Sequence, residues 1–237
     1  LGSGGEALGE DLLSWGKEIL NVNINEFYGQ TECNLTISNC GKIMKQKFGS
    51  IGRPVPGHDV KLMNKDGFFI NNEDQEGEIV VNSRSPATFL GYWNNKTETK
   101  KKIIDGWLHT GDYATLDHEN YFYFKGRKDD LINSSGYRIG PSEIENTILS
   151  FDEVEMVAVI GVPDDLRGQV VKAVIVPKNK SFVKNQNSEL KDKIRYHVKN
   201  KLAAHEYPRI ISFVSELPLT NTGKIKRNIL RQNHLRE

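Results

Sequence analysis

The stretch that decides the fold is residues 126–143, which read Gly-Arg-Lys-Asp-Asp-Leu-Ile-Asn-Ser-Ser-Gly-Tyr-Arg-Ile-Gly-Pro-Ser-Glu. Its first five residues are polar or charged and stand between two apolar runs, which is typical of a boundary between folded parts. The stretch ends on a predicted helix start, where Ser142 can cap the helix and Glu145 can close a capping box. The chain is thus predicted to divide into residues 1–126 and 127–237.

After this stretch the chain alternates helix-like and strand-like segments. The runs 154–162 and 170–176 are apolar and rich in β-branched residues, which favours strands. The pattern predicts a helix to about Ser150, those two strands, a polar loop at 178–188, a helix with Leu190, Ile194, Val198 and Leu202 on one face, a strand at 209–214 and a basic tail. This order indicates a compact α+β module of about a hundred residues, which is large enough to fold alone.

Before this stretch the chain mostly resembles a small twisted β unit. Residues 6–20 place apolar side chains at helical spacing, and residues 22–28 are typical of a strand that runs into a glycine turn. Short alternating runs favour strands at 59–63, 77–82, 112–116 and 121–124, with a hairpin turn at 117–120. The chain is therefore predicted to be of the α+β class.

Composition excludes several kinds of protein. The chain has 237 residues, and its formal net charge of +1 gives no basis for a nucleic-acid or anionic-membrane partner. The two cysteines, Cys33 and Cys40, are too few for a disulfide framework, and no His/Cys spacing is typical of zinc. No apolar run approaches the roughly 20 residues of a membrane span. We expect free thiols in a reducing compartment, hence an intracellular, cytoplasmic protein, with mitochondria as the alternative.

Two further segments carry residue types that suit a nucleotide. The Tyr28 ring can stack on a flat base, the Thr31 hydroxyl can bind a phosphate oxygen, and the Glu32 carboxylate can hold Mg²⁺. In residues 107–112, the carboxylate of Asp112 stands beside a glycine and can accept both hydroxyls of a ribose. Both segments are interpreted as loops that could hold a ligand, but both can also be plain turns, and these alternatives stay open.

A fourth segment, residues 217–227, places Lys224 directly after a Thr-Gly turn. A lysine in this position is a mobile cation on a flexible loop. The spacing G-x-x-x-x-G-K-[ST] of a phosphate-binding loop is absent, so we reject that interpretation. Basic residues also gather near the end of the chain, where they can form a solvated helix face or bind an anionic ligand.

In order and spacing, these segments resemble the adenylate-forming superfamily of acyl-CoA synthetases, luciferases and peptide-synthetase adenylation domains, and in particular the medium-chain acyl-CoA synthetases. The resemblance runs from Gly4 to about Leu230, and its most specific parts are residues 126–143, Tyr207-Pro208-Arg209 and Thr222-Gly223-Lys224. It implies an AMP-forming ligase that joins a carboxylic acid to CoA through an acyl-adenylate, using ATP, CoA and Mg²⁺.

The resemblance also implies a domain organisation. Residues 1–126 would be the end of a large domain, with a truncated sheet and a small β-barrel-like subdomain. Residues 127–237 would be a small mobile C-terminal domain, and Asp129 would be its hinge.

Roles for single residues follow from the same resemblance. The ATP- or AMP-binding set would be Gly5, Glu6, Ala7, Glu26, Phe27, Tyr28, Gly29, Gln30, Thr31, Asp112, Phe124, Arg127 and Lys224. Tyr28 would stack on adenine, and Asp112 would accept the ribose hydroxyls with Arg127 behind it. Glu32 would hold Mg²⁺. Lys224 would be the catalytic residue, since an ammonium ion offsets negative charge as the carboxylate meets the α-phosphate.

The remaining roles concern CoA and the acyl group. The CoA-binding set implied by the resemblance is Ser135, Gly136, Tyr137, Arg138, Arg167, Lys199, Tyr207, Pro208 and Arg209. The acyl pocket would be bounded by Gly4, Gly29 and Thr31. Two glycines there would leave room for a medium-chain or aromatic acid. The substitution Gly29→Trp is then expected to shift preference toward acetate or propionate.

The chain also departs from the family pattern. The Ser/Thr/Gly-rich loop ending in Lys that would grip the β- and γ-phosphates has no match here. We therefore expect a C-terminal fragment that is inactive alone, with the missing N-terminal half as a covalent or split partner. Residues 1–48 would belong to an incomplete sheet and are expected to pack poorly or to pair with another copy. Two alternatives remain: a ligase whose acceptor is a carrier protein, and a non-catalytic module that binds nucleotide or CoA.

Overall fold

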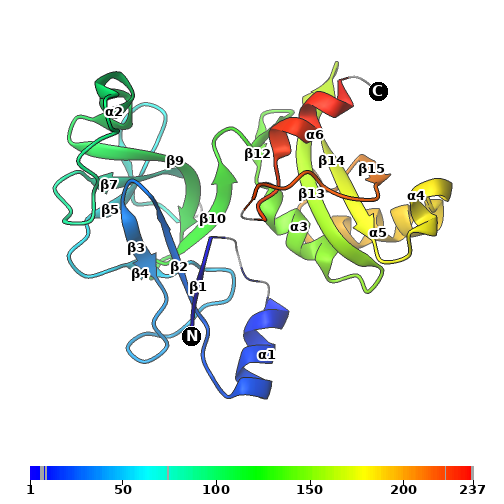
Figure 1. Ribbon diagram of the computed structural model, residues 1–237, viewed down its shortest axis with the longest axis horizontal. Helices are drawn as coiled ribbons and strands as arrows, with labels where there is room; N and C mark the ends of the chain where they lie inside the picture. The colour runs from blue at the N-terminus through cyan, green and yellow to red at the C-terminus, as the bar shows by residue number, and fades with distance from the viewer. Residues whose placement is uncertain (6–7, 9, 74, 222, 236–237) are drawn as a thin grey trace. The chain divides into compact units, whose positions relative to one another are not determined.

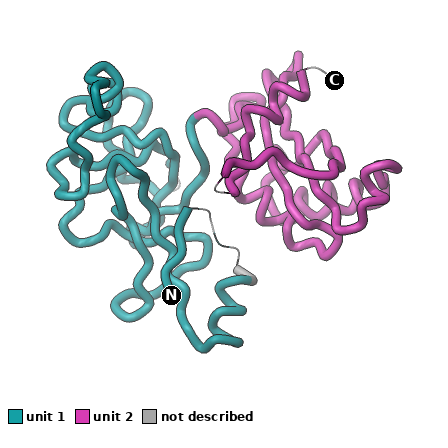
Figure 2. The backbone as a smooth tube through the Cα atoms, in the orientation of Figure 1, with its two compact units in different colours: residues 1–128 teal, residues 129–237 magenta. Residues whose placement is uncertain are grey.

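The chain folds into two compact units, residues 1–128 (unit 1) and residues 129–237 (unit 2), which are coloured separately in Figure 2. The computed structural model describes residues 1–5, 8, 10–73, 75–221 and 223–235. The division falls in the polar start of residues 126–143. The predictions made for Glu6, Ala7 and Thr222 lie outside the described residues.

Unit 1 begins with a four-stranded sheet. Its strands, in order across the sheet, are β1 (Gly2–Gly4), β2 (Asn25–Gln30), β3 (Asn34–Ser38) and β4 (Arg53–Pro54), and helix α1 (Glu10–Leu20) connects the first two (Figure 1). The predicted first helix is confirmed from Glu10 onward. The strand predicted at 22–28 is displaced, because antiparallel pairing with β3 carries it through Gln30. Gly29 and Gln30, which were predicted to lie in the turn after the strand, are therefore strand residues.

The rest of unit 1 is a curled antiparallel sheet. It has the strand order β10-β9-β7-β5-β6, formed by β5 (Val60–Met63), β6 (Phe69–Ile70), β7 (Gly77–Asn82), β9 (Trp107–Leu116) and β10 (Phe122–Arg127); α2 (Lys96–Lys102) leads into β8 (Ile103–Ile104), which pairs with β9. The four predicted strands and the hairpin turn at 117–120 are confirmed. The interpretation of residues 107–112 as a loop is wrong, because they pair with β7 and, at Asp112, with β10.

The two sheets of unit 1 share one hydrophobic core. Tyr28, Cys33 and Ile37 from the first sheet pack with Leu62 and Ile79 from the second. The expectation that residues 1–48 pack poorly is therefore wrong for β2 and β3. It describes α1 better, whose Leu12, Trp15 and Ile19 side chains are 45%, 46% and 66% exposed.

Unit 2 is built around a mixed sheet. Its elements are β11 (Ile132–Ser134), β12 (Tyr137–Ile139), α3 (Pro141–Leu149), β13 (Val154–Asp164), β14 (Gly168–Pro177), α4 (Ser181–Asn185), α5 (Ser188–Lys201), β15 (Ile210–Phe213) and α6 (Arg227–His234). The sheet has the order β12-β11-β14-β13. In addition, β15 pairs in parallel with residues 172–175 of β14. The predicted α+β class is confirmed.

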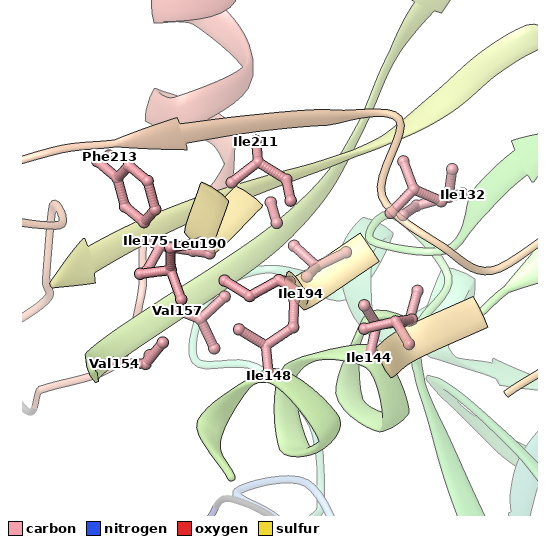
Figure 3. Packing of buried hydrophobic residues seen from close by; sticks show 14 of the residues in the cluster. Ile132, Ile144, Ile148, Val154, Val157, Ile175, Leu190, Ile194, Ile211 and Phe213 are labelled. Carbon is pink, nitrogen blue, oxygen red and sulfur yellow. The ribbon is translucent and has the colours of Figure 1, made fainter. Parts of the chain in front are cut away.

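The long strands of unit 2 are buried on both faces over most of their length, which explains why their sequences are mainly apolar, with charged exceptions such as Glu155 and Lys172. Val157 and Val159 of β13 face a core that includes Ile144 and Ile148 of α3 and Ile194 of α5; Figure 3 labels these residues except Val159. The alternate residues Ala158, Ile160 and Val162 face a second cluster that includes Leu217 and Leu230. Burial of this kind stabilises by roughly 25 cal/mol per Å² of apolar surface.

Three local predictions for unit 2 are wrong. The polar segment 178–188 contains the short helix α4, which ends where Gln186 adopts a left-handed backbone. The basic tail is the helix α6, which buries Leu230 between two arginines, Arg227 and Arg231. Ser142 does not cap α3, because the helix begins at Pro141 with Gly140 before it. The Glu145 carboxylate does not close a capping box and instead accepts a hydrogen bond from the backbone N–H of Val159 at 2.7 Å.

Candidate functional site

In unit 1, side chains from three strands converge on the carboxylate of Asp112. The Tyr28 hydroxyl donates to its Oδ2 at 2.6 Å, and the Gln30 amide donates to the same oxygen at 3.1 Å. Arg127 is the cross-strand partner of Asp112, and its Nε lies 3.9 Å from Oδ1. The structure thus brings together four residues of the predicted nucleotide set and leaves one carboxylate oxygen beside a guanidinium.

Burial shapes the chemistry of this cluster. Asp112 is only 6% exposed, and burial raises its pKa, although Tyr28 and Arg127 act in the opposite direction. Burial and the Asp112 charge raise the pKa of Tyr28 well above its ordinary value. Tyr28 therefore remains a phenol that donates to the carboxylate. Its side chain is 8% exposed, with the Phe124 ring centroid 6.2 Å away, so little of its ring is open to a base.

A second layer of polar contacts holds the strand segment that presents Asp112. Glu78 of β7 accepts the Gly111 backbone N–H at 2.9 Å and lies 3.1 Å from the His109 ring. The Lys102 ammonium donates to the carbonyls of His109 and Thr110 at 3.2 and 3.3 Å. Burial opposes ionisation of Glu78, but the His109 and Gly111 contacts leave its pKa lowered. Glu78 and Lys102 were missed because their contacts depend on tertiary structure, that is, on the register of β7 against β9 and on the position of α2 beside β9.

Glu32, the predicted magnesium residue, lies in the turn between β2 and β3. The Tyr92 hydroxyl donates to its Oε1 at 2.5 Å, and the Phe89 backbone N–H donates to its carbonyl at 2.7 Å. Burial and the Glu32 contact raise the pKa of Tyr92 to about 12, so it stays a donor. Neighbouring Thr31 is exposed. Within the described part of the chain, no group of three or more His, Cys, Asp or Glu side chains could hold a metal.

The glycines of the predicted acyl pocket are explained by backbone packing. A Cβ on Gly29 would lie 1.7 Å from the Asn34 carbonyl oxygen, and one on Gly4 would lie 2.4 Å from the Phe27 ring. The space that a side chain would take at Gly29 and Gly4 is therefore occupied by the Asn34 backbone and the Phe27 ring. These glycines give no reason to expect room for a long acid. The substitution Gly29→Trp is consequently unsuitable as a specificity test.

Glu26 also has a structural partner. It is 5% exposed, and its Oε1 accepts the Leu8 backbone N–H at 2.9 Å. Burial raises its pKa. Glu26 lines a cavity of about 350 Å³ together with residues of α1 and of the segment after β3. In this position it links the start of the chain to β2.

In unit 2, Lys224 is exposed on a tight turn. Two hydrogen bonds join Thr220 and Lys224. The Thr220 N–H donates to the Lys224 carbonyl at 2.7 Å, and the Lys224 N–H donates to the Thr220 hydroxyl at 3.0 Å. Gly223 has a φ of 85°, which a glycine adopts without strain. The backbone of Lys224 is therefore held while its side chain points into solvent.

A group of ion pairs anchors the helix that follows this turn. The Arg227 Nη2 donates to both carboxylate oxygens of Glu145, at 2.7 and 2.8 Å, in a charge-assisted contact. Arg231 donates to Asp130 at 3.1 Å. These contacts fasten α6 to α3 and to the start of unit 2. Sequence reasoning missed them because it read Glu145 as a capping residue.

The predicted CoA residues fall on two neighbouring parts of unit 2. Ser135 and Gly136 form the two-residue turn of the β11–β12 hairpin with φ values of 50° and 86°, and the Ser135 N–H donates to the Arg167 carbonyl at 3.0 Å. Tyr137 and Arg138 follow on β12, both exposed.

The second part is the segment after α5. The Arg209 guanidinium lies 5.0 Å from the centre of the Tyr207 ring and the Lys199 ammonium lies 5.9 Å from it. Pro208, which lies between Tyr207 and Arg209 in the sequence, is buried. The Arg209 backbone N–H donates to the Val171 carbonyl at 3.0 Å. The cations are thus arranged around an aromatic ring rather than spread over a helix face. Asp129 is exposed at the first position of unit 2.

Comparison with known proteins decides the family. Residues 1–93 match the model of the AMP-binding enzymes, and residues 143–224 match the model of the AMP-binding enzyme C-terminal domain. The chain belongs to the AMP-binding, adenylate-forming enzymes. The resemblance predicted from the sequence is thereby confirmed.

Several AMP-binding enzymes are similar along nearly the whole chain. The 4-hydroxybutyrate--CoA ligase 1 of Metallosphaera sedula is 42% identical over 97% of this chain and 40% of its own length. The mitochondrial acyl-coenzyme A synthetase ACSM3 of Mus musculus is 39% identical over 97% of this chain and 40% of its own. A crystal structure of the anthranilate CoA ligase AuaEII with anthranoyl-AMP is 35% identical, with a TM-score of 0.87 over 98% of this chain and 44% of that one.

The chain spans about two fifths of the length of the curated relatives that it matches. None of the helices in its described ranges is both long and apolar enough to cross a membrane.

Proposed function

We propose that this chain provides the ribose-binding and thioester-forming parts of an AMP-forming acyl-CoA synthetase. The net reaction joins ATP, a carboxylic acid and CoA into acyl-CoA, AMP and pyrophosphate. The observation that carries the proposal is the match of AMP-binding models to both units in the expected order. The cluster around Asp112 supports it, because its residues come from separate segments and converge on one acceptor.

In the first step, an oxygen of the acid would attack the α-phosphorus of ATP and the bond to pyrophosphate would break. Asp112 would accept the ribose hydroxyls through Oδ1, while Tyr28 and Gln30 hold Oδ2. Since Tyr28 offers little open ring, we assign it mainly this hydrogen-bonding role. Lys224 would neutralise charge on the reacting oxygens, and positioning of this kind accounts for most catalysis when no covalent bond to protein is formed.

Magnesium fits the donor chemistry at Glu32. Mg²⁺ in nucleotide sites commonly uses one or two carboxylates together with phosphate oxygens and waters. Glu32 supplies one carboxylate, and Tyr92 holds its Oε1 and so orients the group. When bound, the metal would neutralise the phosphate charge.

In the second step, the CoA sulfur would attack the acyl carbon and the bond to AMP would break. We propose that Ser135 and Gly136 line the path of the pantetheine arm, because their turn carries little side-chain bulk. Arg138, Arg167, Lys199 and Arg209 would bind CoA phosphates, beside Tyr207 and Pro208. Asp129 would act as the pivot between the two half-reactions, with residues 1–126 and 127–237 as the two domains.

The acid is proposed to be medium-chain or aromatic. The named substrates of two similar proteins, 4-hydroxybutyrate and anthranilate, support an acid larger than acetate. The glycines at positions 4 and 29 give no support, since their spaces are filled by neighbouring chain.

We further propose that activity requires segments corresponding to the rest of the relatives' length, supplied covalently or as a separate chain. The support is that the matched region is two fifths of those proteins and that no phosphate-gripping loop ending in Lys occurs in the sequence.

Carboxylate-dependent exchange of pyrophosphate into ATP tests this function. The purified chain would be assayed with octanoate, benzoate and acetate, alone and with the corresponding upstream part of a similar ligase. We expect no exchange alone and exchange with the upstream part, highest for octanoate or benzoate. Binding of AMP or CoA without exchange in the completed protein would favour the non-catalytic module. Exchange followed by transfer only to a carrier protein would favour the other acceptor.

A further inference from the structure

An aromatic stack joins the two parts of the predicted CoA surface. The rings of Tyr137 and His205 are 3.9 Å apart at their centroids and lie within 13° of parallel. Tyr137 stands on β12, directly after the Ser135-Gly136 turn, and His205 lies in the segment between α5 and β15. No sequence motif singled out His205.

The chain around His205 is a closed turn. The Glu206 N–H donates to the Ala203 carbonyl at 2.9 Å, and the Glu206 carboxylate accepts the Ala203 N–H at 2.8 Å. These two bonds fix the turn from both sides, which restricts the position of the intervening residue. His205 is therefore presented from a rigid support rather than from a loose loop.

Tyr137, in contrast, has little other support. Its side chain is 53% exposed, and it follows a two-residue turn at the tip of a short hairpin. An exposed tyrosine in such a place would sample several rotamers, and ordering it on ligand binding would cost free energy. The flat face of His205 holds the ring in one orientation before a ligand arrives.

We propose that His205 is a positioning residue of the CoA site, which acts by holding Tyr137 in the orientation that CoA contacts. This inference rests on the proposed function, because it assumes that the surface formed by residues 135–138 and 207–209 binds CoA. The feature that matters is a flat ring at position 205, and neither charge nor proton transfer is involved.

Three variants of this chain test the proposal by calorimetric titration with CoA. His205→Leu removes the flat ring, His205→Phe keeps it, and His118→Leu is a matched control in unit 1, where the side chain is 67% exposed. We expect His205→Leu to weaken CoA binding about 3- to 10-fold, the effect of one lost aromatic pair, and His205→Phe to stay within about twofold. The control should bind CoA like the unaltered chain.

The outcomes separate the inference from the function beneath it. If the unaltered chain binds CoA and all variants bind equally, the positioning role is overturned while the CoA surface stands. If the unaltered chain and its complex with the upstream part both fail to bind CoA, the CoA part of the proposed function fails as well. In that complex, His205→Leu should raise KM for CoA and leave pyrophosphate exchange unchanged, whereas a general loss of folding would lower both.

A measurement without ligand checks the geometry itself. The stack should shift the ring-proton resonances of Tyr137 upfield, and this shift should disappear in His205→Leu and persist in His205→Phe. Tyrosine resonances that do not respond to either substitution would contradict the stack and with it the proposal.

Discussion

The acceptor at Asp112 and the lysine at position 224 are built in opposite ways. Asp112 is buried, and its Oδ2 is held by two side chains that come from a different strand. Lys224 is exposed, and its two hydrogen bonds to Thr220 are made through its backbone. The difference fits the two tasks proposed above. Asp112 would recognise a sugar and is fixed in advance, whereas Lys224 would meet developing charge and is left free to reach it.

Because Asp112 is fixed by its surroundings, its proposed role in binding is coupled to the folding of unit 1, whereas the exposed Lys224 has no such coupling in unit 2. Fixing a buried carboxylate requires donors in set positions, and its support extends through Glu78 and Lys102 to two further elements. Substitutions near Asp112 should therefore change folding and binding together. Substitutions at Lys224 should change chemistry and leave folding unchanged. The following predictions test that contrast, from the largest expected effect to the smallest.

Lys224→Ala should lower pyrophosphate exchange about 100- to 1000-fold in the completed protein, the usual effect of removing one group that stabilises transition-state charge. The urea midpoint of the chain should not change, because the side chain is exposed. Lys201→Ala, at another exposed lysine, is the control and should keep full exchange. A large fall in the urea midpoint of Lys224→Ala would contradict the contrast.

Gly29→Ala should lower the free energy of unfolding by about 3 kcal/mol, since a Cβ there would meet the Asn34 backbone at 1.7 Å. Gly223→Ala, beside Lys224, has open space around it and a φ of 85°, so it should cost only about 1 kcal/mol of backbone strain. Urea denaturation measures both. Equal losses would mean that the Lys224 turn is as constrained as β2.

Tyr28→Phe should lower the free energy of unfolding by about 1–2 kcal/mol, because the buried Asp112 carboxylate loses its closest donor. Tyr196→Phe is the matched control, at a tyrosine that is 73% exposed, and should change it by less than about 0.5 kcal/mol. The same pair of variants should be compared for AMP affinity. A stable Tyr28→Phe protein with unaltered AMP binding would argue against the preformed acceptor.

Asp117→Asn should have the smallest effect, about 1 kcal/mol at pH 7, by removing the Lys47 ion pair from the turn between β9 and β10. Burial opposes ionisation, but the Lys47 and backbone contacts lower the pKa of Asp117 to about 2. A lowered pKa in the folded state stabilises at pH values above the unfolded pKa of roughly 4. The difference between the two proteins should therefore shrink as the pH falls from 5 toward 2, and a constant difference would contradict this assignment.

Sequence patterns predicted the framework of unit 2 well because its strands are buried on both faces. Residues 154–162 and 170–176 are apolar except for Glu155, Gly161 and Lys172, and the step of four from Leu190 to Val198 places one helix face in the core. Helix α6 escaped prediction, since it buries Leu230 and, apart from Ile229, its other residues are polar or charged. The capping prediction at Ser142 failed because Pro141 starts the helix one residue earlier.

The candidate site was only partly predictable. Motifs indicated Asp112, Tyr28 and Gln30, but that one carboxylate oxygen accepts from both side chains depends on sheet register. Other contacts also depend on the tertiary structure, because the partners lie far apart in the sequence. Glu78 and Gly111 are 33 positions apart, Tyr92 and Glu32 are 60 apart, and His205 and Tyr137 are 68 apart. Residues of this kind are read from the sequence as ordinary strand or loop positions.

The most direct test of a preformed ribose acceptor is to titrate this chain with AMP and with 2′,3′-dideoxy-AMP. The two nucleotides differ only in the hydroxyls that Asp112 would accept. We predict that AMP binds at least about tenfold more tightly, because a buried acceptor left without its donor is costly, and that Asp112→Asn removes the difference. Equal affinities for the two nucleotides, or a difference that survives in Asp112→Asn, would contradict the account.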